Sequence, residues 1–221
     1  MRANLPVFAV IIGLLTAPAS AATYSLLPTA DGDVRTFGGD AVDTTTAFIS
    51  VSQSGGNINN GVLVYDLSPI PDTASILSAR LDVTLNRFIS NTPALNPAPA
   101  AVDLFVFAGD GTVDISDYSA TGTQVFDDTT PAGGTGGDVR SFTFTDVTSL
   151  ESLLGGNLAT IRFETDSFAS LQFASNESSL YSPATLVIET ETTPIPLPGG
   201  LPLLAAALGV TAVVKRRRSL R

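Results

Sequence analysis

Three aspartates stand at short intervals in the stretch GDGTVDISDYS, which spans residues 109–119: Asp110, Asp114 and Asp117. Carboxylate oxygens are the ligands that a hard cation prefers, and calcium takes about six to eight oxygens. The pair Asp110 and Gly111 also suits a tight turn, because glycine adopts backbone conformations that other residues avoid. The stretch therefore has two interpretations, a calcium loop and a surface turn. The turn is favoured, because three carboxylates do not complete a calcium site.

The same stretch resembles the second half of an EF-hand or dockerin calcium loop. Four residues fall at the fifth, sixth, ninth and twelfth positions of such a loop: Asp110, Gly111, Asp114 and Asp117. The resemblance implies calcium as a cofactor held by these carboxylates. The first and third positions would be Val106 and Ala108, which carry no side-chain oxygen. No other cofactor is expected.

The chain contains no histidine and no cysteine, which removes much catalytic chemistry. The common zinc sites, the Ser-His-Asp triad and thiol nucleophiles all need one of these residues. A glycosidase needs only two carboxylates across a cleft, but a pair can always be nominated among 21 acidic residues. We therefore expect no enzyme activity, and a carbohydrate-active enzyme remains as one alternative.

Aromatic side chains can stack on sugar rings, and the candidates here are Tyr65, Tyr118 and Phe126. The Asn-rich stretch SGGNINNG, residues 54–61, could offer amides to the same ligand. An aromatic residue on an alternating strand is more often part of the core. Because nothing in the sequence places these residues together, glycan binding stands as an alternative function.

The beginning of the chain has the plan of a secretory signal peptide. Met1 and Arg2 give a positive start, residues 7–15 are apolar, and Ala19-Ser20-Ala21 is a small-x-small cleavage site. A segment of this kind is removed on export. We assign residues 1–21 to a signal peptide and expect an exported protein.

Charge is distributed unevenly along the chain. The middle keeps five arginines against all 21 acidic residues, which makes a formal charge of −16. Such a surface repels nucleic acid and anionic lipid, and it suits solubility or the binding of cations. Nucleic acid is therefore excluded as a partner.

After residue 22, short runs of β-branched and aromatic residues alternate with Gly, Pro, Asp and Asn. This pattern predicts strands at 46–51, 61–67, 78–88, 101–108, 138–147, 159–165, 169–175 and 184–191. A short helix is expected from Thr148 or Ser149, ending at Gly155. We predict an all-β fold, a single jelly-roll-like β-sandwich over residues 22–191.

One segment of this middle, VLVYDLSPIPDTASILSARLDVTL at residues 62–85, has a recognisable pattern. The residues that carry it are Tyr65, Asp66, Leu67, Ser68, Ile70, Pro71, Ala74, Ile76, Ala79, Leu81 and Val83. The pattern resembles the DNRLRE-type β-sandwich domains of bacterial surface proteins. The resemblance implies a jelly-roll-like fold on an exported protein, with polysaccharide binding in some members. No functional residue is transferred, because folding alone accounts for the matched positions.

The end of the chain has three parts: residues 192–200 are rich in Pro and Gly, 201–214 are apolar, and 215–221 are mostly basic. As a helix the apolar part would be about 21 Å long, against about 30 Å of bilayer hydrocarbon. This hydrophobic helix is therefore shorter than a permanent transmembrane helix needs to be. The basic residues that would hold its end in the cytoplasm are Lys215, Arg216, Arg217 and Arg218.

Five residues precede the apolar part in this order: Ile195, Pro196, Leu197, Pro198 and Gly199. With the apolar part and the basic cluster, they resemble the VPLPA variant of the PEP-CTERM sorting signal, with Ile for Val and Gly for the final Ala. The resemblance implies recognition by an exosortase, a membrane-embedded peptidase of Gram-negative bacteria that cuts near the Pro-rich motif. Such systems accompany exopolysaccharide production. A plain C-terminal anchor is the alternative.

Together these patterns predict an exported, exosortase-sorted, non-catalytic protein of the cell surface or the biofilm matrix. The expected partners are the exosortase, the inner membrane during transit, and an exopolysaccharide. A carbohydrate-binding module that recognises a cell-surface polysaccharide is the alternative from a different class.

Overall fold

The computed structural model describes residues 21–54, 56–90, 99–131, 134–166 and 169–191. Ala21–Glu191 form one compact unit. Ala21, the last residue of the predicted signal peptide, is here the first residue of a strand. The unit therefore begins one residue before the predicted domain and ends with it.

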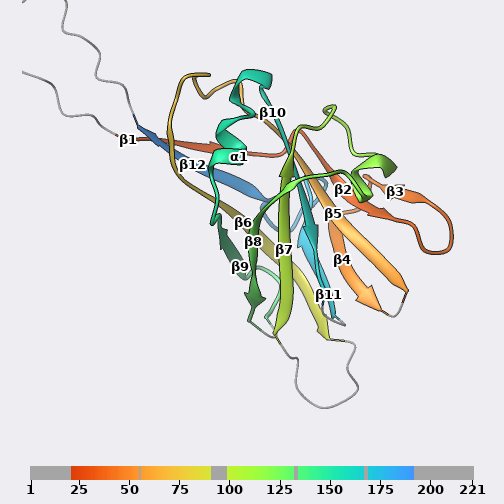
Figure 1. Ribbon diagram of the computed structural model, residues 1–221. Coiled ribbons are helices and arrows are strands. Elements are labelled where there is room, and N and C mark those ends of the chain that lie inside the picture. Colours follow the sequence, from red (N-terminus) through yellow and green to blue (C-terminus); the bar gives the residue numbers. More distant parts are fainter. Residues whose placement is uncertain (1–20, 55, 91–98, 132–133, 167–168, 192–221) are drawn as a thin grey trace, which may run out of the picture. The chain divides into compact units, whose positions relative to one another are not determined.

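The described chain consists mainly of strands joined by turns (Figure 1). The strands are β1 (Ala21–Leu26), β2 (Ala30–Arg35), β3 (Ala41–Asp43), β4 (Phe48–Ser54), β5 (Asn57–Asp66), β6 (Ile76–Ser90), β7 (Ala100–Phe107), β8 (Thr123–Thr130), β9 (Val139–Thr143), β10 (Leu158–Glu164), β11 (Ala169–Ala174) and β12 (Thr185–Glu191). The helical segments are η1 (Ile115–Tyr118), α1 (Thr148–Glu151) and η2 (Leu154–Gly156). The predicted all-β class is confirmed.

The strands form one curled antiparallel sheet in the order β1-β12-β6-β11-β4-β5-β10-β7-β8, with β2, β3 and β9 joined at its sides. The long strand β6 is shared between two parts of the sheet. Its first half pairs with β12 and β9, where Arg80 lies opposite Val187 and Thr143. Its second half pairs with β11, where Leu85 lies opposite Phe173. Because the sheet curls at β6, its strands face each other across a shared core in a sandwich-like fold.

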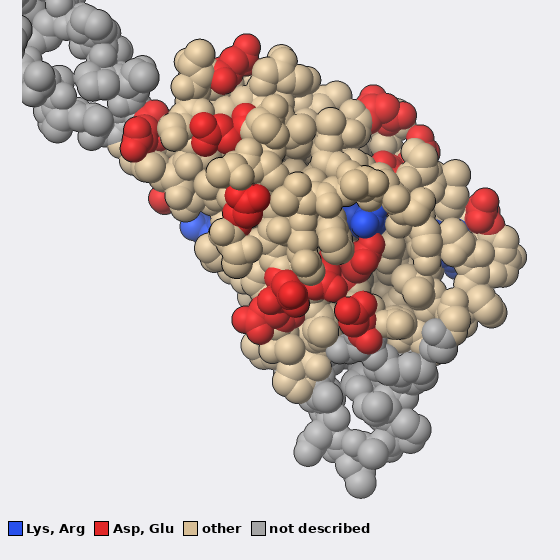
Figure 2. Space-filling model, viewed as in Figure 1, with Lys and Arg blue, Asp and Glu red and all other residues tan. Residues whose placement is uncertain are grey.

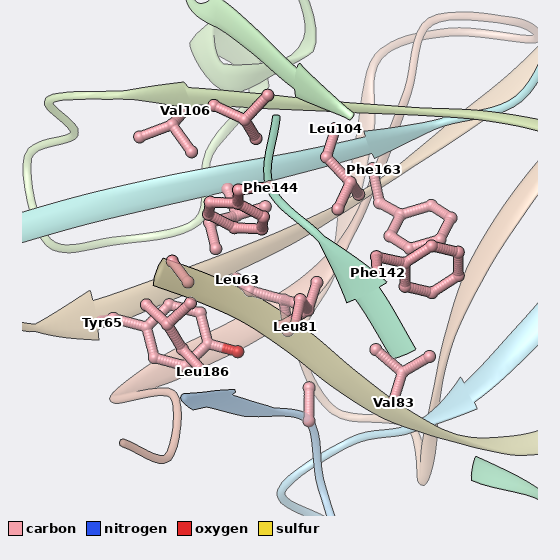
Figure 3. Packing of buried hydrophobic residues seen from close by; sticks show 14 of the residues in the cluster. Leu63, Tyr65, Leu81, Val83, Leu104, Val106, Phe142, Phe144, Phe163 and Leu186 are labelled. Carbon is pink, nitrogen blue, oxygen red and sulfur yellow. The ribbon is translucent and has the colours of Figure 1, made fainter. Parts of the chain in front are cut away.

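A row of phenylalanines connects strands across this core. The ring centroid of Phe163 in β10 lies 5.1 Å from that of Phe142 in β9 and 4.7 Å from that of Phe173 in β11. Phe126 in β8 approaches Phe142 at 5.2 Å. Figure 3 shows Phe142 and Phe163 side by side within the cluster of buried side chains. Edge-to-face ring pairs of this kind add about 0.5–1.5 kcal/mol beyond the burial of their area.

Alternation along β6 explains how one strand serves both the core and the surface. Leu81, Val83 and Leu85 are buried in the core, as the sequence predicts. Arg80 and Asp82 point to the opposite face, where their side chains form an ion pair at 3.1 Å. Successive side chains of a strand point to opposite faces, so this pattern fixes the register of β6.

The eight predicted strands are present, with ends shifted by a few residues, but four further strands were not expected. These are β1, β2, β3 and β8. In β2 the sequence ADGDVR has the composition of a turn. A side chain at Gly32 would collide with the backbone of Asp43, so the glycine allows the close approach of β2 and β3. The space that this glycine leaves allows β2 to form a strand although its residues have a low β propensity.

The predicted short helix is present, but both of its predicted ends are wrong. Val147 is the N-cap of α1, and the carboxylate of Asp146 accepts the backbone N–H of Thr148 at 2.9 Å. The segment continues as η2 and stops at Asn157, which has a left-handed φ of 59°. An Asx turn and a left-handed asparagine thus replace the expected Thr148 cap and Gly155 stop. Among the residues that the structure describes, no helix has the length and apolar character needed to cross a membrane.

Candidate functional site

The outer face of β10 carries a buried arginine beneath a loop. Ile161 and Phe163 of β10 point into the core, whereas Arg162 points to the opposite face, where its side chain is only 8% exposed. Its Nη1 donates hydrogen bonds to the carbonyl oxygens of Asp117 and Ala120, at 3.0 and 2.6 Å. The Arg162 side chain therefore fastens the segment that contains η1 to the sheet.

Neighbouring strands complete the surroundings of this guanidinium. Arg162 forms an ion pair with Glu164, two residues along the same face of β10. The rings of Phe105 and Phe107 in β7 lie 5.0 and 5.8 Å from its guanidinium carbon. Asn60 in β5 donates to Glu164 at 3.2 Å and so belongs to the same cluster. Aromatic faces and a carboxylate together offset the cost of burying the cation.

Close packing at Gly109 holds the beginning of the loop against the same face. A side chain at Gly109 would collide with the hydroxyl group of Thr160, which is fully buried in β10. Asn60 also donates to the carbonyl oxygen of Tyr118, at 3.4 Å. The loop is thus held at Gly109, at Tyr118 and at the two carbonyls that Arg162 contacts. Its close fit leaves the outer face of β10 covered.

The three aspartates predicted as calcium ligands all lie in this loop. Asp110 accepts the backbone N–H of Thr112 at 2.9 Å, and Asp114 accepts that of Ser116 at 2.7 Å. Asp117 accepts the backbone N–H of Asp114 at 2.9 Å, which completes a capping box around η1. Each carboxylate thus stabilises the backbone of the loop itself, the arrangement expected of a turn.

The electrostatics of this loop follow from burial and proximity. Burial raises the pKa of Asp117 above its usual value, the nearby Asp114 and Asp110 raise it further, and Arg162 opposes them. Hydrogen bonds from Thr112 lower the pKa of the exposed Asp110. In the described ranges, no three acidic side chains converge in a way that could hold a metal ion. The structure brings the aspartates into one loop without assembling a ligand sphere.

A groove of about 300 Å³ opens between β8 and β9, which are edge strands. Its lining combines apolar side chains with hydroxyl groups and one guanidinium: Phe126, Thr129, Thr130, Pro131, Val139, Arg140, Ser141 and Phe142. Val139 is 61% exposed at the rim, and Phe126 is half-buried against Phe142. An aromatic ring beside hydroxyl groups is a surface on which a sugar ring can stack.

The structure separates the three aromatic residues that the sequence offered as sugar platforms. Tyr65 is fully buried in the core, so its assignment as a platform is wrong and the core interpretation is correct. Tyr118 lies in η1 above the outer face of β10. Phe126 lies opposite Leu104 and packs toward the core. Phe126 alone of the three lines the groove.

Acidic side chains gather on β7, β8 and the end of β10. Asp103 in β7 is 8% exposed and accepts a hydrogen bond from Gln124 at 2.9 Å. Its burial and the nearby Asp166 raise its pKa. Figure 2 shows red acidic surface over the region of β7 and β8, with little basic surface in this view. An anionic ligand would meet repulsion over this region, whereas a neutral one would not.

Another buried carboxylate lies on β2, which pairs with β5. Asp31 is 4% exposed and accepts the backbone N–H of Asn176 at 2.9 Å. Asn176 in turn donates from its side chain to the carbonyl oxygen of Pro28 at 2.9 Å. Burial, together with the neighbouring Glu177, raises the pKa of Asp31 to about 6. This cluster ties the connection between β11 and β12 to β2.

The predicted sorting motif at 195–199, the hydrophobic segment at 201–214 and the basic residues at 215–218 lie outside the described residues, as do residues 1–20. A scan against protein-family models gives no match for this chain, and a search of curated proteins gives no significant match.

Proposed function

We propose that this chain is an exported, non-catalytic protein of the cell surface or extracellular matrix of a Gram-negative bacterium, delivered there by an exosortase-type peptidase. The observation that carries the proposal is the order of three parts at one end of the sequence. A Pro-rich motif at 195–199 is followed by an apolar segment at 201–214 and then by four consecutive basic residues. The basic residues hold their end in the cytoplasm, which leaves the acidic domain outside.

Several properties of the domain suit a passive role outside the cell. Its fold does not depend on disulfides, since the chain has no cysteine. Its core instead joins both parts of the sheet through buried side chains. The formal charge of −16 over the middle of the chain favours solubility in a crowded matrix. The expected partners are the sorting peptidase, the inner membrane during transit and the exopolysaccharide.

The test is the intact mass of the mature protein, isolated from cells with and without the sorting peptidase. We expect a product shortened near residues 195–199 only when the peptidase is present. Replacing both Pro196 and Pro198 with alanine should abolish the shortening. Pro202→Ala, just beyond the motif, is the matched control and should be processed normally. A tail of unchanged mass in both strains would contradict the proposal.

A second candidate function, glycan binding, is supported by the groove between β8 and β9. Phe126 lies beside Thr129 and Ser141 there, so that an apolar ring and hydroxyl groups line one hollow. Stacking on the ring and hydrogen bonds to the hydroxyl groups are the contacts that a neutral sugar unit needs. Asp127 and Asp128 on β8 favour a neutral polysaccharide over an anionic one.

Glycan binding is tested by sedimentation of the protein with the insoluble polysaccharide of its own matrix. Phe126→Ala should reduce the bound fraction severalfold. Phe37→Ala is the matched control, because Phe37 is 58% exposed in the turn between β2 and β3, which is not part of the groove. Circular dichroism of both variants separates lost binding from lost folding. Equal binding by the two variants would exclude the groove.

A further inference from the structure

Four strands lie at edges of the described sheet, and three of them carry features that discourage pairing with another chain. β3 has only three residues. β8 carries Asp127 and Asp128 and a register shift against β7, and β9 carries Arg140. Short strands, charges and bulges all protect an edge from unwanted partners. β1, with the sequence AATYSL, has no charge, no proline and a regular register with β12.

Residues 22–26 of β1 have an outer edge that can accept a further strand. Along its inner edge, β1 pairs with β12, with Thr23 opposite Glu189 and Leu26 opposite Leu186. Along the outer edge, residues 22–26 have no strand partner within the described part of the chain. Backbone N–H and C=O groups on such an edge can accept a strand from another molecule.

The side chains of β1 make this edge complementary to itself. Thr23 and Ser25 are exposed on one face, and Ala22, Tyr24 and Leu26 are half-buried on the other. If β1 pairs antiparallel with a copy of itself about Tyr24, then Thr23 lies opposite the partner's Ser25. Ala22 then lies opposite the partner's Leu26. Polar side chains thus lie opposite polar ones and apolar side chains opposite apolar ones, so this register suits both sides of the extended sheet.

Charge also favours this edge over the others for contact between two acidic domains. The acidic residues on the strand next to β1 are Glu189 and Glu191 of β12. In a pair joined through β1, the two β12 strands would stand three strand spacings apart, about 14 Å. That distance exceeds the screening length of about 8 Å at physiological salt. On β8, by contrast, Asp127 and Asp128 would face a partner directly.

We propose that the outer edge of residues 22–26 in β1 is a self-association surface, which pairs antiparallel with the same residues of a second copy of this chain across a two-fold axis at Tyr24. The contact uses the same surface on both copies, so it closes as a dimer. A ladder of five residues buries little area, so the dimer is weak and forms where the protein is concentrated. This surface does not depend on how the protein is sorted or on glycan binding.

Cross-linking of the full chain tests the register directly, because the natural protein has no cysteine. Two differently tagged chains, Thr23→Cys and Ser25→Cys, are expressed together and oxidised mildly. Opposite residues of an antiparallel pair have Cα atoms about 4.5–5.5 Å apart, within the range of about 4.4–6.8 Å that a disulfide spans. We expect the yield of the mixed disulfide dimer to exceed severalfold the yield from a control pair in which both chains carry Thr129→Cys on β8. Equal yields would overturn the proposal.

A charge on the same edge supplies a second test that keeps the fold. Ser25 is exposed, so Ser25→Lys should fold and melt like the natural protein. In the proposed register it places one cation from each copy at diagonal positions of the ladder, and it should reduce severalfold the co-isolation of two tagged full chains at high protein concentration. Loss of co-isolation with unchanged melting supports pairing through β1. Co-isolation that persists in Ser25→Lys means that another surface joins the copies, and it overturns the proposal.

Discussion

On one face of β10, Ile161 and Phe163 pack among the many apolar side chains of the core, and no single contact dominates. On the other face of the same strand, Arg162 alone holds two loop carbonyls, a carboxylate and the faces of two rings. Adjacent residues are thus buried by different means. The core face spreads its stabilisation over a network, whereas on the loop face one guanidinium makes most of the polar contacts, aided by Asn60 and the close packing of Gly109. Substitutions on the two faces should therefore differ in how far their effects reach.

The largest expected effect comes from the core face. Phe163→Ala removes a ring that contacts Phe142 and Phe173, and should lower the free energy of unfolding by about 3–5 kcal/mol. Urea denaturation followed by circular dichroism measures this change. Phe37→Ala, at an exposed ring, should change the free energy by less than about 0.5 kcal/mol. Equal losses in the two variants would mean that the core does not depend on the row of rings.

Arg162→Met should cost somewhat less, about 2 kcal/mol, because Glu164 is 26% exposed and water screens it once its partner is removed. The effect should be local: amide hydrogen exchange should accelerate within residues 109–122 and stay slow in β10 and β5. Arg80→Met, at an exposed ion pair, is the control and should change the free energy by less than about 0.5 kcal/mol. A uniform loss of protection in Arg162→Met would show that both faces unfold as one unit.

The next effect is a dependence on pH that arises at Asp31. Its pKa in the folded protein is about 6, above the ordinary value of 3.8. Folding therefore favours the protonated form, and this stabilisation is complete below about pH 4 and is lost as the pH rises through 6. Asp31→Asn stays neutral, so it should match the natural protein at pH 4 and exceed it by about 2 kcal/mol at pH 8.

Asp66→Asn serves as the control for that experiment, since its expected sign is opposite. Hydrogen bonds from Ser68 lower the pKa of Asp66, which favours the charged form in the folded protein. Its contribution is therefore present at neutral pH and is lost as the pH falls. Asp66→Asn should gain nothing at pH 8. A gain in both variants would point to relief of general charge repulsion instead of a specific effect of Asp31.

The smallest effect is expected from calcium at the loop above β10. The carboxylates of Asp110, Asp114 and Asp117 already accept hydrogen bonds from the loop backbone. We therefore expect no measurable change in melting temperature between millimolar calcium and excess chelator. A rise that Asp114→Asn abolishes would establish a calcium site, because a ligand that binds only the folded state must stabilise it.

Strands with clear alternation could be predicted from the sequence, and those that depend on partners could not. Leu81, Val83 and Leu85 specify the core face of β6 without any knowledge of its neighbours. In β2, Gly32 and its flanking aspartates have a turn-like composition. That segment becomes a strand because β5 and β3 offer it ladders on both sides. Pairing of this kind is a property of the assembled sheet and leaves little trace in the local sequence.

In the candidate sites, too, local sequence patterns could be predicted and contacts with distant segments could not. The spacing of the three aspartates correctly placed them in one loop. Phe126 was one of three aromatic residues named as possible sugar platforms, and the sequence did not distinguish it from Tyr65 and Tyr118 or indicate the groove that it lines. Arg162 was not singled out, because alternation along β10 indicates only that it leaves the core. Nothing in the sequence indicates that residues 109–122 fold back over it. Only the structure shows that both faces of β10 are buried, with Thr160 and Arg162 on the face that the loop covers.

The pairing of β1 with β12 has a mechanical consequence. Ala21 and Glu191, where the chain enters and leaves the domain, are direct partners in an antiparallel ladder. A force that pulls these two points apart acts across the strands, along the hydrogen bonds. The force therefore acts on one residue pair at a time. It separates β1 from β12 pair by pair, starting at Ala21 and Glu191. Tension at the ends of the domain would open this ladder before it strained the row of phenylalanines in the core.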